Sequence, residues 1–222
     1  LNQSFEIPLE KIEDEIGSRI NGDLTDYQTI VSPRCLEHVD GITFFRSDIF
    51  ERLIKKIPLR NPNEKIYPYE NSDIRVFCRE PKGFEIGQTF ISSKKVLSIM
   101  NNLEGRIFSG FESKGISKMS PVQIYGTDLQ GRKVLAFYIP PIIEIQGKHA
   151  VLLDGIHRSY ICKSAGTTIN AVHINDVSMP LPFEPINWKN ASLQDEKPPI
   201  DQRYKNLKKE YFRDLSAIGV DG

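Results

Sequence analysis

The residues best suited to catalysis or ligand binding lie together in the run DGIHRS, residues 154–159. Asp154 can hold a metal ion or accept a proton from a substrate hydroxyl, and His157 can act as hydrogen-bond donor, general base or cation. Arg158 carries a forked guanidinium that matches phosphate oxygens, and Ser159 carries a hydroxyl that can donate to one more. These residue types in one short run indicate a site for phosphate or carboxylate.

The residues on either side of this run predict the local structure that positions it. Residues 150–153 predict a buried strand, Gly155 allows a tight turn, and residues 157–165 predict a helix that Gly166 ends. A strand, a glycine turn and a helix start direct unpaired backbone N–H groups toward one point, with the positive end of the helix dipole behind them. We therefore expect a phosphate to bind to Gly155, Ile156, Arg158 and Ser159.

A purely structural interpretation of the same residues is equally open. Asp154 can cap the following helix, and Arg158 can simply pair with Asp154. His149 and His173 fall in predicted strands, where structural histidines are commoner than ligands. Glu144 stands in the apolar strand PIIEI, and simple alternation would turn its carboxylate to solvent.

The charge balance of the chain excludes one broad class of function. The 222 residues carry 29 Lys+Arg and 29 Asp+Glu, so the protein has no general attraction for nucleic acid or anionic lipid. The charges are unevenly spread, because residues 1–40 are acidic and residues 41–120 are basic. A basic face is therefore possible only in the middle of the chain, around residues 46–95, where dispersed charges favour a solvated surface.

Two further features bear on location and redox chemistry. No run of about 18 apolar residues is present, so a membrane-spanning helix is not expected, and the acidic start is unlike a basic secretory leader. We expect a cytoplasmic protein. An odd number of cysteines without a CxxC spacing predicts reduced thiols and disfavours a zinc site; they are Cys35, Cys78 and Cys162.

Hydrophobic periodicity predicts helices and strands in a mixed order. A helix is predicted over 47–57, a second from residue 92 or 93 to Gly105, and a loop over 106–119. After Asp201 an amphipathic helix is predicted, which can dock on its own domain or on another subunit. The predicted strands cover residues 4–9, 74–80 and 84–91 (the last two as a hairpin), 122–126, 134–139, 141–145, 149–154 and 169–174.

Two segments of the chain resemble a known family. The sequence PPIIEIQGKHAVLLDGIHRSYICKSAGTTINAVHI, residues 140–174, resembles the nucleotide-binding core of the ParB/sulfiredoxin superfamily, in which a hairpin delivers a DGxHR-type motif to a helix start. The opening FEIPLEKIE, residues 5–13, is similar to the first strand of that superfamily. The resemblance implies an α+β fold in which a ParB/sulfiredoxin-like mixed sheet with flanking helices is enlarged by a long insertion and a C-terminal helix.

The resemblance also implies a division of the chain into three parts. Residues 1–120 would form an N-terminal region that holds the opening strand and an α/β insertion. Residues 121–177 would form the nucleotide-binding core, and residues 178–222 a Pro-rich segment followed by the amphipathic helix.

Departures from the superfamily patterns narrow the implied function. Sulfiredoxin chemistry needs a cysteine where this chain has Ile156, and centromere binding needs a helix-turn-helix domain that the sequence does not indicate. The remaining branch, with a free-standing DGxHR motif, includes free-serine kinases and defence-system proteins. It implies ATP or CTP with Mg²⁺, catalytic roles for Asp154 and His157, and Asp154 as the metal ligand; Glu10 is a conceivable upstream base.

Three functional hypotheses follow. The first is a nucleotide-dependent phosphotransferase or NTPase, with a small hydroxyl compound as a possible acceptor. The second is a DNA-associated or defence-system protein that binds DNA without catalysis, through Lys55, Lys56 and Arg60 of the basic middle region. The third is a structural module that forms a homodimer through the C-terminal helix.

Overall fold

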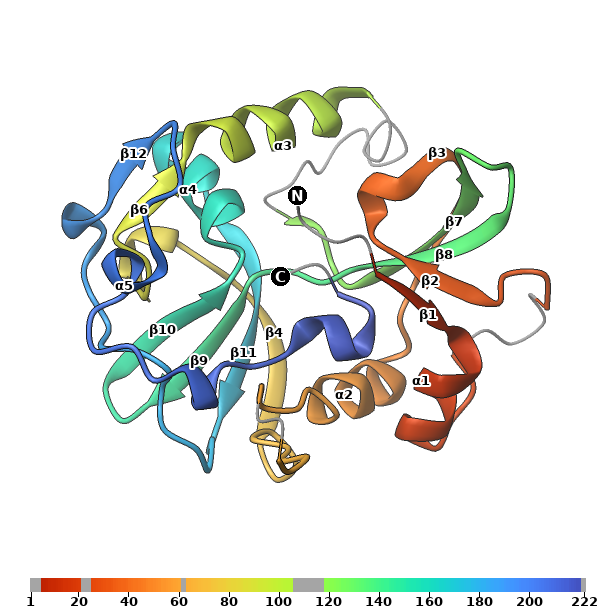
Figure 1. The fold of residues 1–222 in the computed structure, drawn as a ribbon, viewed down its shortest axis with the longest axis horizontal. Coiled ribbons are helices and arrows are strands. Elements are labelled where there is room, and N and C mark those ends of the chain that lie inside the picture. Colours follow the sequence, from red (N-terminus) through yellow and green to blue (C-terminus); the bar gives the residue numbers. More distant parts are fainter. Residues whose placement is uncertain (1–4, 21–24, 61–62, 106–117, 221–222) are drawn as a thin grey trace. The chain divides into compact units, whose positions relative to one another are not determined.

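The structure, a computed structural model, describes residues 5–20, 25–60, 63–105 and 118–220 (Figure 1). The chain forms two compact units, each assembled from segments that are distant in the sequence. Unit 1 comprises Leu1–Glu70, Ser120–Ile139 and Arg213–Gly222, and unit 2 comprises Asn71–Met119 and Pro140–Phe212. The predicted DGIHR turn belongs to unit 2.

Unit 1 is built around a mixed sheet with the strand order β1-β2-β8-β7-β3. Neighbouring strands run antiparallel except for β2 and β8, which are parallel. Helix α2 buries its apolar face, including Ile49, Leu53 and Ile54, as the sequence period predicts. The elements are β1 (Glu6–Pro8), α1 (Leu9–Ile16), β2 (Thr29–Val31), η1 (Pro33–Cys35), β3 (Leu36–Phe44), α2 (Ser47–Lys55), β7 (Val122–Asp128), β8 (Lys133–Tyr138) and η7 (Leu215–Ile218).

Unit 2 contains a second mixed sheet with the order β4-β11-β9-β10-β5 and a small parallel pair, β12-β6. Helices α3 and α4 follow β6 and β10 directly. The elements are β4 (Asp73–Arg79), η2 (Pro81–Gly83), β5 (Glu85–Ile86), β6 (Phe90–Ser92), α3 (Ser93–Gly105), β9 (Ile142–Gln146), β10 (His149–Asp154), α4 (Ile156–Ser164), β11 (Ile169–Asn175), η5 (Trp188–Asn190), β12 (Ser192–Gln194), α5 (Ile200–Arg203) and η6 (Lys209–Tyr211).

The core of unit 2 packs around the DGIHR turn, which lies between a strand and a helix. Ile156 and Cys162 on one face of α4 pack with Leu152 of β10, and Trp188 joins the same cluster. The indole Nε1 of Trp188 donates a hydrogen bond to the carbonyl oxygen of Pro81 at 2.9 Å. Since Trp188 is the single tryptophan of the chain, its fluorescence reports on unit 2.

Many predicted elements are present, and the α+β class is confirmed. The helices at 47–57 and 93–105 correspond to α2 and α3, and the strands from residue 122 to 174 correspond to β7 through β11. Residues 106–117 of the predicted loop lie outside the described residues. No helix in the described ranges is both long enough and apolar enough to cross a membrane.

The predicted hairpin between residues 74–80 and 84–91 is wrong. Strand β4 pairs antiparallel with β11 along its whole length, and β5 pairs parallel with β10. The intervening Pro81 begins the 3-10 turn η2, which carries the chain away from β4. The pairing of β4 therefore depends on a strand almost 100 residues later, which local patterns do not reveal.

The predicted amphipathic helix after Asp201 is also wrong. Helix α5 ends at Arg203, and Asn206 adopts a positive φ of 51°, which breaks a helix. The aromatic residues at helical spacing instead form a cluster, in which Tyr204 stacks on Phe183 and contacts the ring of Phe212 edge to face. The continuous dimerisation helix of the third hypothesis is therefore not formed.

The two units divide the chain differently from the three predicted segments. The predicted core, residues 121–177, contributes β7 and β8 to unit 1 but β9, β10 and β11 to unit 2. The opening strand β1 lies in unit 1, apart from the unit that contains the DGIHR turn.

Candidate anion-binding site

A glycine-dependent turn links β10 to α4. Gly155 has φ +83° and ψ 24°, in the left-handed region, and a Cβ at this position would lie 2.8 Å from the Cβ of Pro141. Backbone conformation and close approach therefore both require glycine here. Helix α4 begins at Ile156, and no side chain in the described part of the chain caps its start. The positive end of its dipole is thus available to an anion.

Asp154 and Arg158 form an ion pair across the turn. An Nη of Arg158 donates to an Oδ of Asp154 at 2.9 Å, and the two side chains are only 16% and 14% exposed. The pairing that the structural interpretation proposed is therefore present. A guanidinium has five N–H donors, and the printed hydrogen bond to Asp154 uses one of them.

His157 connects the start of α4 to the start of α3. Its Nε2 accepts a hydrogen bond from the backbone N–H of Ser92 at 3.2 Å, so in the neutral ring the proton resides on Nδ1. Burial, together with the charges of Lys95, Arg158 and Lys197, lowers the pKa of His157 to about 4. At neutral pH the imidazole is therefore uncharged.

Cations from three elements surround this histidine. Lys95 lies in the first turn of α3, where its N–H donates to the hydroxyl of Ser92 at 3.3 Å. Partial burial lowers the pKa of the Lys197 ammonium, and the charges of Arg203 and Lys95 act in the same direction. These lysines and Arg158 create a positive potential at the start of both helices.

Ser159 differs from its predicted role as an accessible phosphate donor. Its side chain is fully buried, and in the described part of the chain its Oγ has no hydrogen-bond partner. The hydroxyl can contact a phosphate only if the turn opens toward it. The backbone N–H of Ser159 is already bonded to the carbonyl oxygen of Gly155 at 2.9 Å.

The prediction that Glu144 faces solvent is wrong. Its side chain is fully buried in β9, and one of its oxygens accepts a hydrogen bond from Gln146 Nε2 at 3.0 Å. Alternation fails because β9 is an interior strand, with β11 on one side and β10 on the other, and both of its faces are covered.

The two other strand histidines have contrasting surroundings. His149 is exposed, and its Nδ1 lies 2.5 Å from Glu85 Oε2. His173 is buried against the rings of Phe77 and Phe84, and among the described residues its Nε2 has no hydrogen-bond partner. Burial lowers the pKa of His173 to about 4, and the charge of Arg79 contributes. Neither histidine joins the DGIHR turn as a ligand group.

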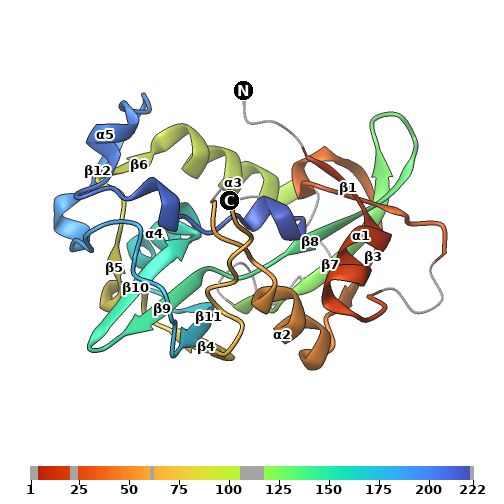
Figure 2. The same ribbon diagram turned by 60° about the horizontal axis from the view of Figure 1, so that its bottom comes forward.

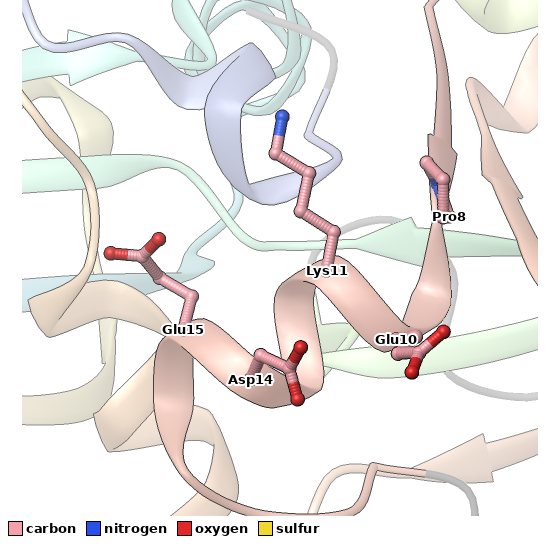
Figure 3. Close-up of a pocket in the computed structure, with 5 residues that line it drawn as sticks. All are labelled: Pro8, Glu10, Lys11, Asp14 and Glu15. Carbon is pink, nitrogen blue, oxygen red and sulfur yellow. The ribbon is translucent and has the colours of Figure 1, made fainter.

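The conceivable base Glu10 lies in unit 1. It lines a shallow hollow along α1 (Figure 3), and the ammonium of Lys11 points away from the carboxylates of Glu10 and Asp14. Glu15 at the other end of the hollow is bonded to Lys65 and Tyr67. The hollow is a row of solvated helix residues; its lining is Pro8, Glu10, Lys11, Asp14 and Glu15.

The donor set of the turn fits an anion better than a metal ion. In the described ranges no three His, Cys, Asp or Glu side chains gather at metal-binding distance. Asp154, the predicted Mg²⁺ ligand, already accepts a hydrogen bond from Arg158. Since Mg²⁺ at nucleotide sites is usually held by one or two carboxylates together with the phosphates, the Mg²⁺ ion stays a prediction.

The cations assigned to DNA binding have local partners in unit 1. Lys55 pairs with Glu51 at 2.7 Å, Lys56 lies 4.8 Å from the ring centre of Tyr67, and Arg60 lies 3.8 Å from Asp214. The basic middle region is also divided between the two units, because unit 2 begins at Asn71. These contacts give no specific support to the DNA-binding hypothesis.

The sequence analysis did not identify Ser92, Lys95 and Lys197 as part of the site. One signal was available: consecutive lysines in the first turn of α3 oppose the helix dipole, and such a placement favours a bound anion. The position of Lys197 has no local signal, because a tertiary contact brings it there.

Comparison with protein-family models, with curated proteins and with solved structures found no match for this chain. The resemblance to the ParB/sulfiredoxin superfamily therefore stays a prediction.

Proposed function

We propose that unit 2 binds the phosphate groups of a nucleotide at the DGIHR turn and that the protein is a nucleotide-dependent phosphotransferase or NTPase. One arrangement carries the proposal: Arg158 and the half-buried His157 lie in the first turn of α4, whose start has no side-chain cap among the described residues. The charges of Lys95 and Lys197 also act on His157. Three cations beside an uncapped helix start favour an anion with several oxygens.

The charges of the site support phosphate as the ligand. Asp154 neutralises the charge of Arg158. The charges of Lys95 and Lys197 repel each other. A dianionic phosphate would offset this repulsion and accept hydrogen bonds from the first-turn amides of α4. The same phosphate would favour the imidazolium form of His157, so its pKa would rise on binding.

The roles of the individual residues follow from their placement. Arg158 would hold phosphate oxygens through its guanidinium, beside Asp154. Asp154 would orient Arg158 and accept the proton of an attacking hydroxyl or water. His157 would hold the starts of α3 and α4 together and stabilise developing negative charge. The choice of nucleotide, ATP or CTP, and the transfer reaction itself rest on the superfamily resemblance.

Thermal unfolding followed through Trp188 fluorescence tests the proposal. A ligand at about 100 times its Kd stabilises the folded state by about 2.7 kcal/mol, so ATP or CTP should raise the Tm by several degrees. Arg158→Ala should remove this rise. The ligand-induced shift is the relevant quantity, since loss of the ion pair with Asp154 lowers the Tm by itself.

Arg75→Ala is the matched control for that experiment. Arg75 is exposed on β4, where it pairs with Asp73 at 2.9 Å in the same unit. The nucleotide-induced rise should persist in this variant. An equal rise in Arg158→Ala, or no rise with any common nucleotide in the unaltered protein, would contradict the proposal.

A further inference from the structure

Strand β4 forms one edge of the unit 2 sheet. Figures 1 and 2 both show it beside β11, with β9 and β10 on the other side of β11. All seven residues of β4 pair with β11, and in the described part of the chain no other segment pairs with this strand. Alternate residues of β4 therefore direct their backbone N–H and C=O groups outward, at an edge that can accept another strand.

The side chains of β4 leave this edge accessible. Phe77 is 42% exposed, and Arg75, Cys78 and Arg79 are exposed as well. Proteins usually block an exposed edge strand with a proline, a bulge or charged side chains. Strand β4 contains no proline, and its register with β11 has no bulge. Charge is the remaining protection, so the order of the charges decides which partner strand is excluded.

The order of these charges makes β4 complementary to an antiparallel copy of itself. A two-fold axis at Val76, the central residue, pairs all seven residues and places Asp73 of each copy opposite Arg79 of the other. The two neighbouring registers are unfavourable. An axis at Arg75 would place this arginine opposite itself, and an axis at Phe77 would place Arg75 opposite Arg79.

The other cross-strand pairs of this register are also compatible. Ile74 would lie opposite Cys78, which pairs two apolar side chains. Arg75 would lie opposite Phe77, whose ring can accept a cation. Among the described residues Arg79 forms no ion pair, so its guanidinium is available to a carboxylate of a second copy.

We infer that β4 is a dimerisation strand, on which a second copy of this chain adds its own β4 in antiparallel orientation around Val76. The two unit 2 sheets then form one continuous sheet, in which main-chain hydrogen bonds supply affinity and the Asp73–Arg79 pairs fix the register. This surface goes beyond the proposed function, because the DGIHR turn lies after β10 and not on β4.

Sedimentation equilibrium of the full chain tests the dimer. The unaltered protein should pass from monomer to dimer as its concentration rises to about 100 μM. Arg79→Glu sets two carboxylates opposite each other at both ends of the paired strands, so it should raise the dimer Kd by at least about tenfold. Asp73→Lys/Arg79→Glu restores opposite charges and should recover most of the affinity.

Lys148→Glu is the matched control, because it makes the same change of charge. Lys148 is exposed in the turn between β9 and β10, and β11 separates these strands from β4. The dimer Kd of this variant should stay within about twofold of that of the unaltered protein. Unfolding followed through Trp188 fluorescence checks that unit 2 is folded in each variant.

A disulfide tests the register. In Ile74→Cys the new thiol faces Cys78 of the second copy, with Cβ atoms about 4.5–5.5 Å apart, so oxidation with diamide should give a covalent dimer. Within one copy the two positions are about 14 Å apart along the strand, too far for an internal disulfide. Arg75→Cys faces Phe77 instead and should cross-link no more than the unaltered protein.

Three results would overturn the inference. A monomer at every concentration would exclude a second copy and leave the edge to a strand of another protein. A dimer whose Kd is unchanged in Arg79→Glu would be held by another surface, and absence of a covalent dimer in Ile74→Cys would exclude the register. Nucleotide binding is measured separately, and none of these results affects it.

Discussion

The imidazole Nε2 of His157 accepts a hydrogen bond from the backbone N–H of Ser92 at 3.2 Å, which joins the first turn of α4 to the start of α3. Because both helices begin at this bond, the positive ends of their dipoles act in one region. The bond also requires an unprotonated Nε2, and the lowered pKa of His157 supplies this form at neutral pH. A single contact thus links helix geometry, charge and protonation state.

Replacement of Gly155 should destabilise unit 2 more than replacement of another glycine with positive φ. Gly155→Ala forces a Cβ to within 2.8 Å of Pro141 in the left-handed conformation, so we expect a loss of about 3 kcal/mol or more. Gly147 has φ +61° but open space around it, so Gly147→Ala should lower the free energy of unfolding by only about 1 to 2 kcal/mol. Urea unfolding followed through Trp188 measures both losses; equal losses would show that the contact with Pro141 is not limiting.

Acid should weaken unit 2 through its buried histidines. The folded-state pKa of His173 is about 4, below the ordinary value of about 6.5, so the unfolded chain binds more protons in this range. The stability that the folded state gains by keeping His173 neutral is therefore complete above pH 6.5 and is lost as the pH falls toward 4. Between pH 6.5 and 5 the loss from this residue should reach at most about 2 kcal/mol.

His173→Gln should flatten this pH dependence, because the glutamine does not titrate. Unfolding free energies at several pH values, read from Trp188 fluorescence, measure the slope. The exposed His149 provides the control, and His149→Gln should keep most of the slope of the unaltered protein. An unchanged slope in His173→Gln would assign the acid sensitivity to other groups, with His157 as the first candidate.

The cysteines should react with an alkylating reagent in the order of their accessibility. Cys78 is exposed on β4 and should be labelled within minutes near pH 7.5. Cys162 is fully buried, and burial raises the pKa of its thiol to about 11, so it should react only after unfolding. Peptide mass spectrometry distinguishes the sites. Fast labelling of Cys162 in the native protein would contradict its placement and reopen thiol chemistry beside the turn.

Neutralisation of Asp154 should separate binding from turnover. In Asp154→Asn the guanidinium of Arg158 loses its anionic partner and can interact more strongly with phosphate. Nucleotide binding should therefore become tighter, with a Kd several-fold lower. Turnover should fall by about 100-fold or more if Asp154 accepts the proton of the attacking group. Asp73→Asn, which removes a carboxylate from an exposed pair with Arg75, should change neither quantity. Weaker nucleotide binding in Asp154→Asn would show that Asp154 chiefly positions Arg158.

The sequence predicted those elements in which local rules and tertiary packing agree. The strand before Asp154, the turn at Gly155 and the helix that follows each have a strong local signal, and all three are present. The same holds for α2, whose apolar face is buried. Strand β2 was missed because it has only three residues, and β3 was missed because its nine residues include Glu37, His38 and Asp40, which mask its pattern.

The failed predictions concern features that distant residues determine. The sequence pattern of β4 predicts a hairpin with residues 84–91, but in the structure β4 forms its backbone hydrogen bonds with β11. Tyr204 follows a helical spacing, but stacking on Phe183 holds it in an extended segment. The same reason explains the site: the DGIHR residues are contiguous and could be identified, whereas Lys197 joins them only through the pairing of β12 with β6.

Calorimetric titration of ATP and CTP into the full chain tests the central claim most directly. The account predicts one nucleotide bound per chain, a Kd that rises by about 100-fold in Arg158→Ala, and a Kd in Arg75→Ala within about twofold of that of the unaltered protein. Absence of binding in the unaltered protein, or equal Kd values for the unaltered protein and Arg158→Ala, would contradict phosphate binding at the DGIHR turn.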